Sequence, residues 1–563
     1  MESCKGKLAV YTREVTTGYT ISLANSVHFA YSEDGQSYKP LNQNYGMLFA
    51  KADIDGNNQI VEKGLTAPQV CQDEKLGFCI VAVRTNADGS RDEACEGSVL
   101  LWTTEDFVNF VEHGEVKLSE YPSLVDVLKE NKPVEGCLPE GAIGGNAIEI
   151  SKEMGESLLI HWSYLYNTKI QVPEYIEAEA VEDVREVKAT AVYSDGSAVS
   201  KAVCWDVSEV NFSVPGEYTI SGRVKAPKYG FPLAKGYADP VACYWKGYYY
   251  YMATNDNTGD IGLYIRRAGT LEGLFAEDVK EYVILDKDTR MGFIQTFWAP
   301  ELHIINDKLY ILFAVSGEAF GPQCHMMELK GNGNPINAED WETPIRVVTR
   351  DGGALFEGGI TLDMTYLKVK DTSYLVWSSR INCCAPGDTG SMLYIATIDE
   401  EKPWVLTSDA VLLSRPLYGW ENNAGTINNE GPFPLLTEDM VYLMYSGGAA
   451  GGETYTIGCL SIPCEGDLLN PTQWEKAKQP LLSHYSMEGI YGPGHNAFVV
   501  DEEGQLNILY HAQELPGMAK RCTGIHRVHF SKDGFPVLSM TGDRDLNPAL
   551  AEVTIKVRIR ETI

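Results

Sequence analysis

The sequence lacks any run of the roughly 20 apolar residues that a membrane-spanning helix needs. Its first residues, MESCKGKLAVYTREV, also lack the apolar stretch of a signal peptide. The 13 cysteines are an odd number and are scattered, which favours free thiols over a disulfide framework. These absences predict a cytoplasmic protein that does not enter a membrane.

Basic residues are scarce: 46 lysines and arginines stand against 78 acidic residues, and the net charge is −32. Such a chain repels phosphate backbones and anionic lipids, so we expect neither nucleic acid nor membrane as a partner. Glycine (53), tyrosine (31) and tryptophan (10) are abundant, which is typical of a turn-rich all-β protein. With 563 residues, the chain is long enough for several domains.

Five aromatic-rich segments recur between residues 239 and 515. Each has a polar anchor followed by an apolar strand, and successive anchors are 62, 62, 67 and 65 residues apart. The anchors are Asp239, Glu301, Asp363, Glu430 and His495. One strand-rich unit per fixed period predicts a five-bladed β-propeller. Because the innermost strands of blades converge on the axis, we expect all five anchors to surround one central cavity.

Two further all-β regions precede these repeats. Residues 1–167 predict a propeller-like domain too short for five blades; it includes NAIEISKEMGESLLIHWSYL, interpreted as part of a blade. Residues 168–227 have hairpin turns and a core tryptophan, Trp205, and they resemble bacterial immunoglobulin-like modules, a small β-sandwich spacer. Residues 228–563 form the expected catalytic domain, and its tail, 542–563, either closes the last blade or lies on a neighbouring domain.

The anchors have distinctive neighbours. Pro240 favours an extended Asp239 at a strand entrance. Asp363 follows the apolar Leu362, which is costly unless the carboxyl is hydrogen-bonded or functional. Glycine and proline after Glu430 indicate a fixed turn that presents its side chain.

Several other residues are candidates for binding a sugar. Phe297 and Trp298 suggest an aromatic wall beside a sugar ring, although packing between blades explains Trp298 equally well. Tyr491 opens the fifth repeat. Arg415 is a candidate for contact with sugar hydroxyls, and a surface salt bridge is an equally good interpretation.

Two separated carboxylates in a neutral, aromatic-lined pocket favour glycoside hydrolysis. One must be ionised to activate water, and the other must be protonated to release the leaving oxygen. A third carboxylate near the acid raises its pKa by like-charge repulsion.

Residues 233–541 resemble glycoside hydrolase family 43, the five-bladed propellers that include α-L-arabinofuranosidases, arabinanases and β-xylosidases. The matching segments are GYADPVACYWKGYYYYMATND, FWAPELHIINDKLYILFA, ITLDMTYLKVKDTSYLVWSS, NNEGPFPLL and GPGHNAFVVDEEGQLNILYHA.

The resemblance implies a role for each anchor. Asp239 is then the general base, Glu430 the general acid and Asp363 the residue that orients this acid and adjusts its pKa. Members of the family invert the anomeric carbon and need no cofactor for the chemistry. His495 matches a position near a structural calcium or sodium ion, and Glu301, with Trp298, lines the sugar pocket.

The predicted activity is release of terminal L-arabinofuranose from plant cell-wall oligosaccharides, with a role in xylan degradation. The chain lacks the long C-terminal β-sandwich typical of bacterial β-xylosidases, which favours an arabinofuranosidase; β-xylosidase and exo-arabinanase activity stay open. A non-catalytic carbohydrate-binding propeller is disfavoured by the intact acidic trio. A five-bladed fructan enzyme is disfavoured because Ala238, not asparagine, precedes Asp239.

Overall fold

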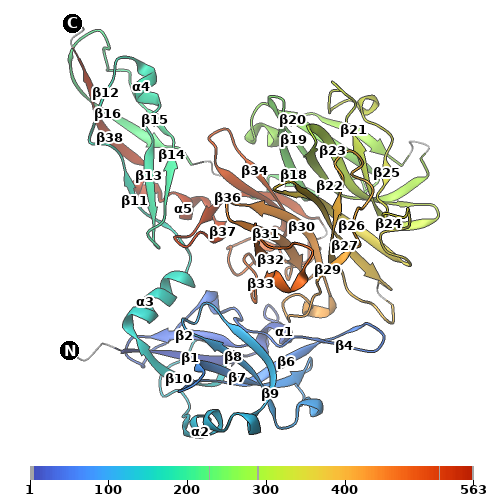
Figure 1. Ribbon diagram of the computed structural model, residues 1–563. Coiled ribbons are helices and arrows are strands. Elements are labelled where there is room, and N and C mark those ends of the chain that lie inside the picture. Colours follow the sequence, from blue (N-terminus) through green and yellow to red (C-terminus); the bar gives the residue numbers. More distant parts are fainter. Residues whose placement is uncertain (1–4, 227–228, 288–290, 384, 519, 561–563) are drawn as a thin grey trace. The chain divides into compact units, whose positions relative to one another are not determined.

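The computed structural model describes residues 5–226, 229–287, 291–383, 385–518 and 520–560, and the chain is mostly β-strand (Figure 1). It divides into two compact units. The first comprises residues 1–163, 231–499 and 509–524, and the second comprises residues 164–230, 500–508 and 525–563. Within the described ranges, no helix is both long and apolar enough to span a membrane.

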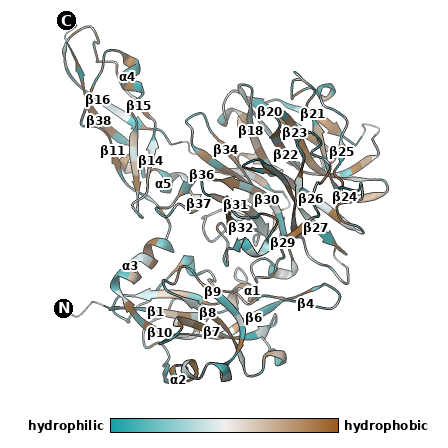
Figure 2. Cartoon of the chain, in the orientation of Figure 1, coloured by the Kyte–Doolittle hydropathy of each residue, from teal (hydrophilic) through white to brown (hydrophobic). Residues whose placement is uncertain are grey.

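Residues 5–163, here called the N-terminal domain, contain two four-stranded antiparallel sheets around an apolar core (Figure 2). The first has the order β10 (Ala142–Ser151), β1 (Lys5–Arg13), β2 (His28–Ser32), β3 (Lys39–Pro40). The second has the order β6 (Lys63–Asp73), β7 (Gly77–Asn86), β8 (Ser98–Thr104), β9 (Val111–Lys117). The remaining elements are the hairpin β4 (Asp53–Ile54) and β5 (Ile60–Val61), and the helices α1 (Ile21–Ala24), α2 (Pro122–Glu130) and α3 (Lys152–His161).

Helix α3 differs from the sequence prediction, which assigned this stretch to strands of a blade. The Ser151 hydroxyl accepts a hydrogen bond from the Met154 amide at 3.1 Å and caps the helix. Lysine, glutamate, methionine and leucine then favour helix. Local capping therefore ends β10 at Ser151 and starts a helix immediately.

Five further antiparallel sheets, named I to V, follow along the chain. Sheet I has β18 (Tyr237–Trp245), β19 (Tyr248–Asn255), β20 (Gly262–Ala268) and β21 (Glu281–Asp286). Sheet II has β22 (Phe293–Ile305), β23 (Lys308–Gly317), β24 (Phe320–Glu328) and β25 (Ile345–Arg346). Sheet III has β26 (Gly359–Val369), β27 (Thr372–Ile381), β28 (Met392–Ile398) and β29 (Val411–Ser414).

The last two sheets complete the series. Sheet IV has β30 (Asn429–Leu436), β31 (Met440–Gly447), β32 (Thr456–Pro463) and β33 (Glu475–Lys476). Sheet V has the order β17 (Ala234–Lys235), β36 (Cys522–Phe530), β35 (Leu506–Gln513), β34 (Tyr491–Val500), and β37 (Pro536–Met540) pairs with β36. Sheet V thus combines a strand from before sheet I with strands from after sheet IV.

The first strands of these sheets share one irregularity. Strand β18 contacts β22, β22 contacts β26, and β26 contacts β30. Each of these four strands breaks register with its partner at a bulge. One residue there, and one in β34, has a positive φ: Asp239 (51°), Ala299 (45°), Asp363 (54°), Gly431 (56°) and His495 (46°). The register break thus lies beside four of the predicted anchors, Asp239, Glu301, Asp363 and Glu430, and a bulge of this kind redirects the neighbouring side chains.

Strand β6 of the N-terminal domain carries the same bulge. Its register with β7 shifts between Thr66 and Gln69, and Ala67 has φ 50°. The segment Ala67-Pro68-Gln69 matches Ala299-Pro300-Glu301 of sheet II, with glutamine in place of the carboxylate. This strand thus keeps the backbone of a first strand without its carboxylate.

The second unit contains two small sheets. One has β11 (Asn167–Gln171), β13 (Ala189–Tyr193) and β14 (Ala198–Lys201); the other has β12 (Tyr175–Glu177), β38 (Glu552–Ile559), β16 (Gly216–Val224) and β15 (Val203–Trp205). The unit also contains the short helices α4 (Val181–Arg185) and α5 (Gly542–Asp545), and its residues 500–508 and 525–540 include parts of sheet V. Trp205 lies in its apolar core, as predicted.

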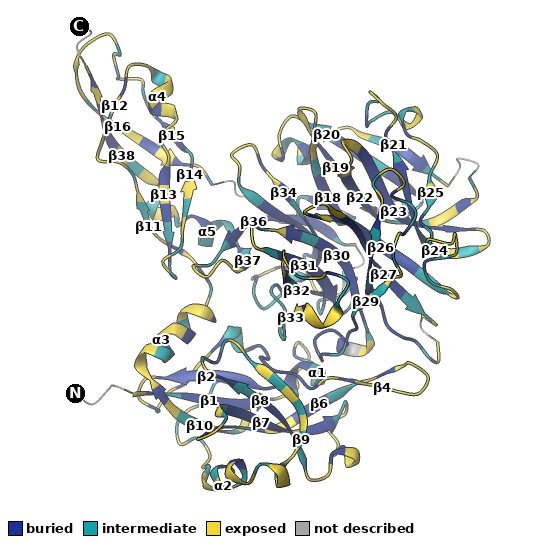
Figure 3. Ribbon diagram, viewed as in Figure 1, coloured by how far each residue is buried: buried dark blue, intermediate teal, exposed yellow. Residues whose placement is uncertain are grey.

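The C-terminal strand β38, whose place the sequence left open, pairs with β12 and β16 in this unit. Its residues alternate between exposed and buried, as expected of a strand with one face on a core (Figure 3).

The N-terminal domain and sheets III and IV share one apolar core within the first unit. Tyr19, Leu23 and Phe49 pack in the same cluster as Tyr418 and Trp420, and all five side chains are almost fully buried. The N-terminal domain therefore covers apolar surface that the following sheets would otherwise expose to water.

Removal of residues 1–163 should destabilise the remainder. The exposed aromatic surface should lower the thermal unfolding midpoint by at least about 5 °C, which corresponds to a few kcal/mol of lost burial. Size-exclusion chromatography and thermal unfolding of the truncated chain measure this. A truncated chain that is monomeric and unfolds at the same temperature as the full-length chain would show that the N-terminal domain does not stabilise the remainder.

Candidate active site

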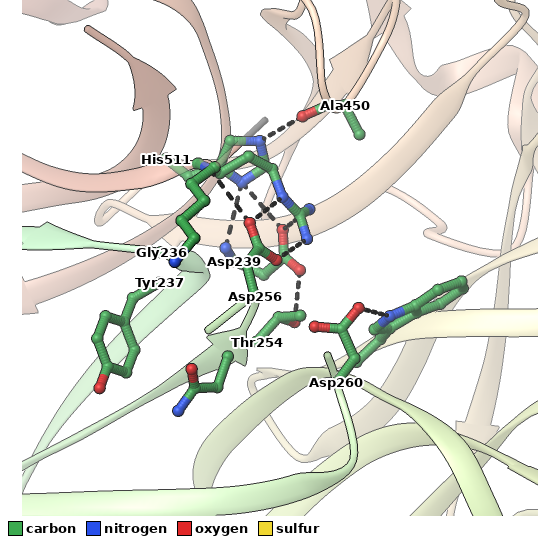
Figure 4. A network of polar contacts seen from close by, with 12 residues as sticks. Gly236, Tyr237, Asp239, Thr254, Asp256, Asp260, Ala450 and His511 are labelled. Carbon is green, nitrogen blue, oxygen red and sulfur yellow. Dashed lines mark hydrogen bonds and ion pairs between the residues drawn. The ribbon is translucent and has the colours of Figure 1, made fainter. Parts of the chain in front are cut away.

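Asp239, on β18, is the centre of a buried network of polar groups. Its Oδ1 lies 3.0 Å from His511 Nδ1, 3.2 Å from His495 Nδ1 and 3.4 Å from Arg521 Nη1. The Thr254 hydroxyl donates to its Oδ2 at 2.6 Å. Figure 4 shows the carboxylate between His511 and Thr254. Four side chains thus hold the two oxygens of this carboxylate: Thr254 on β19, His495 on β34, His511 on β35 and Arg521 just before β36.

The backbone of Asp239 differs from the sequence prediction. Pro240 was expected to hold Asp239 in an extended conformation, but φ is 51°. Aspartate tolerates the left-handed region better than most residues. The bulge of β18 therefore decides this conformation, and it directs the carboxylate into the network.

The surroundings of Asp239 keep it ionised. Burial works against the charged form, but His495, Arg521 and His511 outweigh it and hold the pKa of this carboxyl well below its ordinary value. Burial lowers the pKa of His495 to about 4, so this ring is neutral at pH 7. Arg521 carries a positive charge beside Asp239, which favours the ionised form of this carboxyl.

Asp363 and Glu430 form a second acidic pair, on β26 and β30. Asp363 Oδ2 accepts a hydrogen bond from the Gly431 amide at 3.0 Å, so it is tied to the backbone next to Glu430. Glu430 accepts hydrogen bonds from the Tyr455 hydroxyl at 3.1 Å and the Ser391 hydroxyl at 3.3 Å. The structure thus brings Asp363 to the bulge of β30 that presents Glu430, where the sequence had predicted a turn.

Gly431 is required at this bulge. Its φ is 56°, and a Cβ at this position would lie 3.0 Å from the ring of His495. A larger residue would be strained and would displace the imidazole.

Burial favours the protonated form of both acids. It raises the pKa of Glu430 to about 7, opposed by Tyr455 and Arg380 and reinforced by the charge of Asp239. Burial, followed by repulsion from Glu430 and Asp239, raises the pKa of Asp363 well above its ordinary value. The site therefore holds one ionised carboxylate, Asp239, opposite an acidic pair that retains a proton near neutral pH.

This difference predicts the pH dependence of kcat/KM. Activity should fall as pH rises through about 7, because Glu430 then loses the proton that it must donate. The acidic limb of the profile, where Asp239 becomes protonated, should lie below the ordinary pKa range of aspartate, because the pKa of Asp239 is lowered. Initial rates between pH 4 and 9 should therefore show the basic limb near pH 7 and no loss of activity at the acidic end from protonation of Asp239. A rate that keeps rising above pH 8 would contradict the assignment of the acid.

The other predicted residues are placed differently. Glu301 is buried, and His303 lies 2.5 Å from it. Trp298 is half-buried and donates to Asp260 at 2.9 Å. Tyr491 is half-buried on β34. None of these contacts tests a role in sugar binding, which stays a prediction.

Two predicted sugar contacts need correction. Phe297 is fully buried in the apolar core of sheets I and II, 6.3 Å from the ring of Phe293, so it packs between sheets. Arg415 is also buried, and its guanidinium donates to Asn58 and to the Thr389 carbonyl instead of reaching a pocket or a surface carboxylate.

The predicted calcium or sodium ion near His495 is not tested. Among the residues that the structure describes, no group of three or more His, Cys, Asp or Glu could hold a metal ion. A hydrated ion beside His495 therefore stays a prediction, and no step below uses it.

Sequence reasoning missed four residues of the network: His511, Arg521, Tyr455 and Thr254. Tyr455 stacks on His511, with ring centroids 5.2 Å apart, so it links the surroundings of Asp239 to Glu430. His511 had a signal, because it is a polar residue in the apolar strand LNILYHAQ. Arg521 and Tyr455 lie outside the five anchor positions, and no local pattern marks them.

Comparison with known proteins places this site in a family. Glycosyl hydrolases family 43 matches residues 231–536, and the bacterial Ig-like domain (group 4) matches residues 187–227. An extracellular exo-α-(1→5)-L-arabinofuranosidase from Streptomyces avermitilis is 32% identical over 316 residues, which are 54% of this chain and 62% of the relative. The chain thus spans less than two thirds of that relative.

Two other proteins are similar to this chain. An enzyme with the same name from Streptomyces chartreusis is 30% identical over 344 residues, which are 61% of this chain and 96% of the relative. The solved α-L-arabinofuranosidase from Lactobacillus brevis is 30% identical and covers 55% of this chain and 95% of its own, with a TM-score of 0.48.

These relatives correct the predicted cytoplasmic location. Both Streptomyces relatives are named extracellular enzymes, so the location inferred from the first residues and the cysteines is wrong. An odd number of cysteines means only that at least one thiol has no disulfide partner within the chain. It is therefore weak evidence about the cellular compartment.

The match over residues 231–536, which contains Asp239, Asp363 and Glu430, covers more than half of the chain, and the protein therefore belongs to glycosyl hydrolase family 43.

Proposed function

We propose that the chain is an inverting glycosidase that releases terminal L-arabinofuranose from arabinose-containing oligosaccharides of plant cell walls. The observation that carries the proposal is the opposite ionisation of Asp239 and Glu430, which inverting hydrolysis requires. The names of the curated relatives support the choice of sugar. They also support secretion, which places the enzyme where such polymers occur.

Asp239 is the base in this proposal. Its carboxylate takes a proton from water as that water attacks the anomeric carbon, and Arg521 favours the ionised form at the start. Glu430 donates its proton to the departing oxygen. Asp363, bound to the Gly431 amide, orients the bulge of β30 that carries the acid. Inversion needs the two working carboxyls about 6.5–9.5 Å apart, with room for the water.

We also infer that sheets I to V are the five blades of one propeller. The first strands of sheets I to IV contact one another in sequence order, and each carries a bulge beside its anchor. This arrangement accounts for the meeting of residues 62–67 positions apart at one site.

Two measurements test the activity. Hydrolysis of p-nitrophenyl α-L-arabinofuranoside should exceed that of p-nitrophenyl β-D-xyloside by at least about tenfold in kcat/KM, a ratio that a few pocket contacts supply. The anomeric proton of the first-formed sugar, followed by NMR, should show inversion. Preference for the xyloside would favour a β-xylosidase. A retained configuration, or a covalent glycosyl-enzyme on Asp239, would overturn the assigned roles.

A further inference from the structure

We propose that the β4–β5 hairpin of the N-terminal domain positions the general acid, and that Asn58 and Gln59 do so through residues 387–391. The inference rests on the proposed function, in which Glu430 is the acid. It gives the N-terminal domain a part in catalysis in addition to the apolar core that it shares with sheets III and IV.

The tip of the hairpin binds two groups of the later sheets. Arg415 Nη1 donates to Asn58 Oδ1 at 2.7 Å, and Nη2 donates to the Asn58 carbonyl at 2.8 Å. The Gln59 side-chain oxygen accepts a hydrogen bond from the Gly387 amide at 3.4 Å. Asn58 has φ 67°, a conformation that asparagine tolerates, and this turn presents both of its oxygens to one guanidinium.

Arg415 connects the hairpin to residues 387–391. Its Nη2 also donates to the Thr389 carbonyl at 3.3 Å. The Lys476 ammonium holds the Arg415 carbonyl at 2.8 Å, which fixes the backbone from which the side chain extends. Because Arg415 is buried, these charge-assisted bonds act with little competition from water.

Residues 387–391 in turn hold the acid. The Ser391 hydroxyl donates to Glu430 Oε2 at 3.3 Å, and the Ser391 carbonyl accepts from the Asn429 amide at 2.9 Å. One end of the segment therefore fixes both the carboxyl of Glu430 and the backbone beside it.

Asp388 places a positive charge near the same carboxyl. It binds Arg380 through two bonds, at 2.8 and 2.6 Å, and Arg380 also donates to Asn428 at 3.0 Å. The charged and titratable groups that act on Glu430 are Arg380 on β27, Asp239 on β18, Asp363 on β26 and Tyr455 between β31 and β32. Of these, only Arg380 is held directly by residues 387–391.

Variants of the full-length chain test the inference. Asn58→Gly keeps the positive φ and removes the side-chain acceptor, whereas Asn58→Asp keeps an acceptor for Arg415. Asn57→Ala changes an exposed neighbour on the same turn and serves as the control. Each is assayed on an arabino-oligosaccharide, whose leaving group needs protonation, and on p-nitrophenyl α-L-arabinofuranoside, whose leaving group needs little.

Asn58→Gly should lower kcat/KM on the oligosaccharide roughly tenfold, a part of the 10²–10⁴-fold that acid catalysis supplies, and leave the aryl glycoside nearly unchanged. The basic limb of its pH profile should move upward, because Glu430 loses the hydrogen bond from Ser391 and some of the influence of the positive charge of Arg380. Asn58→Asp should restore both, and Asn57→Ala should match the wild type. Gln59→Ala should show the same selective loss, to a smaller extent.

Thermal unfolding of each variant separates positioning from stability. Equal losses on the two substrates, or no loss in either Asn58→Gly or Gln59→Ala, would overturn the inference while the wild-type activity stands. A wild-type chain that hydrolyses neither substrate would instead overturn the proposed function, and the inference with it.

Discussion

Asp239→Asn should abolish hydrolysis of every substrate, with a loss of at least about 10³-fold in kcat, towards the upper end of what a general base contributes. Asparagine keeps the shape of the side chain and its bond to Thr254, but it cannot accept a proton from water. The same loss is expected on activated aryl glycosides and on oligosaccharides, because water must attack in both. Initial rates on the two kinds of substrate measure it.

The fold should survive this substitution. Arg521 keeps its bonds to Asp256, at 2.7 and 3.2 Å, so the guanidinium does not lose its counter-charge. An unfolding midpoint close to that of the wild type is therefore expected. Measurable turnover in Asp239→Asn at one tenth of the wild-type rate would mean that another group activates the water.

Glu430→Ala should separate substrates by their leaving groups. Hydrolysis of oligosaccharides should fall by about 10²–10⁴-fold, because no group then protonates the departing oxygen. Hydrolysis of p-nitrophenyl glycosides should fall far less, because the nitrophenolate leaves without a proton. The ratio of the two kcat/KM values is the measurement, and equal losses on both substrates would remove Glu430 from the role of acid.

Asp363→Asn serves as the companion variant to Glu430→Ala. Asparagine removes a carboxyl that repels Glu430 when both are ionised, so the basic limb of kcat/KM should move below its wild-type position near pH 7. The rate should fall as well, because the bond to the Gly431 amide loses a charged acceptor. An unchanged basic limb together with a lower rate would restrict Asp363 to orienting the acid.

The sequence by itself predicted the repeats and the acidic residues at their anchors. The period can be recognised in the sequence because every repeat has an apolar strand directly after its anchor. A strand of this kind is encoded by a few consecutive residues. The turn predicted at Glu430 from Gly431 and Pro432 is wrong, because residues 429–436 form strand β30 and these residues lie at its bulge. Trp205 was predicted in a core because a lone tryptophan in an alternating strand has few other places.

The sequence could not predict the ionisation of these carboxyls or their partners. His511 and Arg521 lie 272 and 282 residues from Asp239, and only the pairing of β17 with β36 and the order of sheet V bring that part of the chain to β18. Burial, which raises the pKa of Glu430, is a property of the packed sheets. For Arg415, the sequence left open whether the guanidinium contacts a sugar or a surface carboxylate. In the structure it binds neither of these but donates to Asn58, in the β4–β5 hairpin of the N-terminal domain.

Local order therefore follows from the sequence, whereas the chemistry at the site follows from tertiary contacts. A strand, a turn or a helix cap depends on residues a few positions apart, so its signal is contained in a short window; the cap at Ser151 shows that such a signal can also be misread. The pKa of a carboxyl depends on every charge and every apolar atom within several ångströms, and in a protein built of successive sheets most of those neighbours come from distant segments. The tertiary structure alone decided which carboxyl is ionised and which retains its proton.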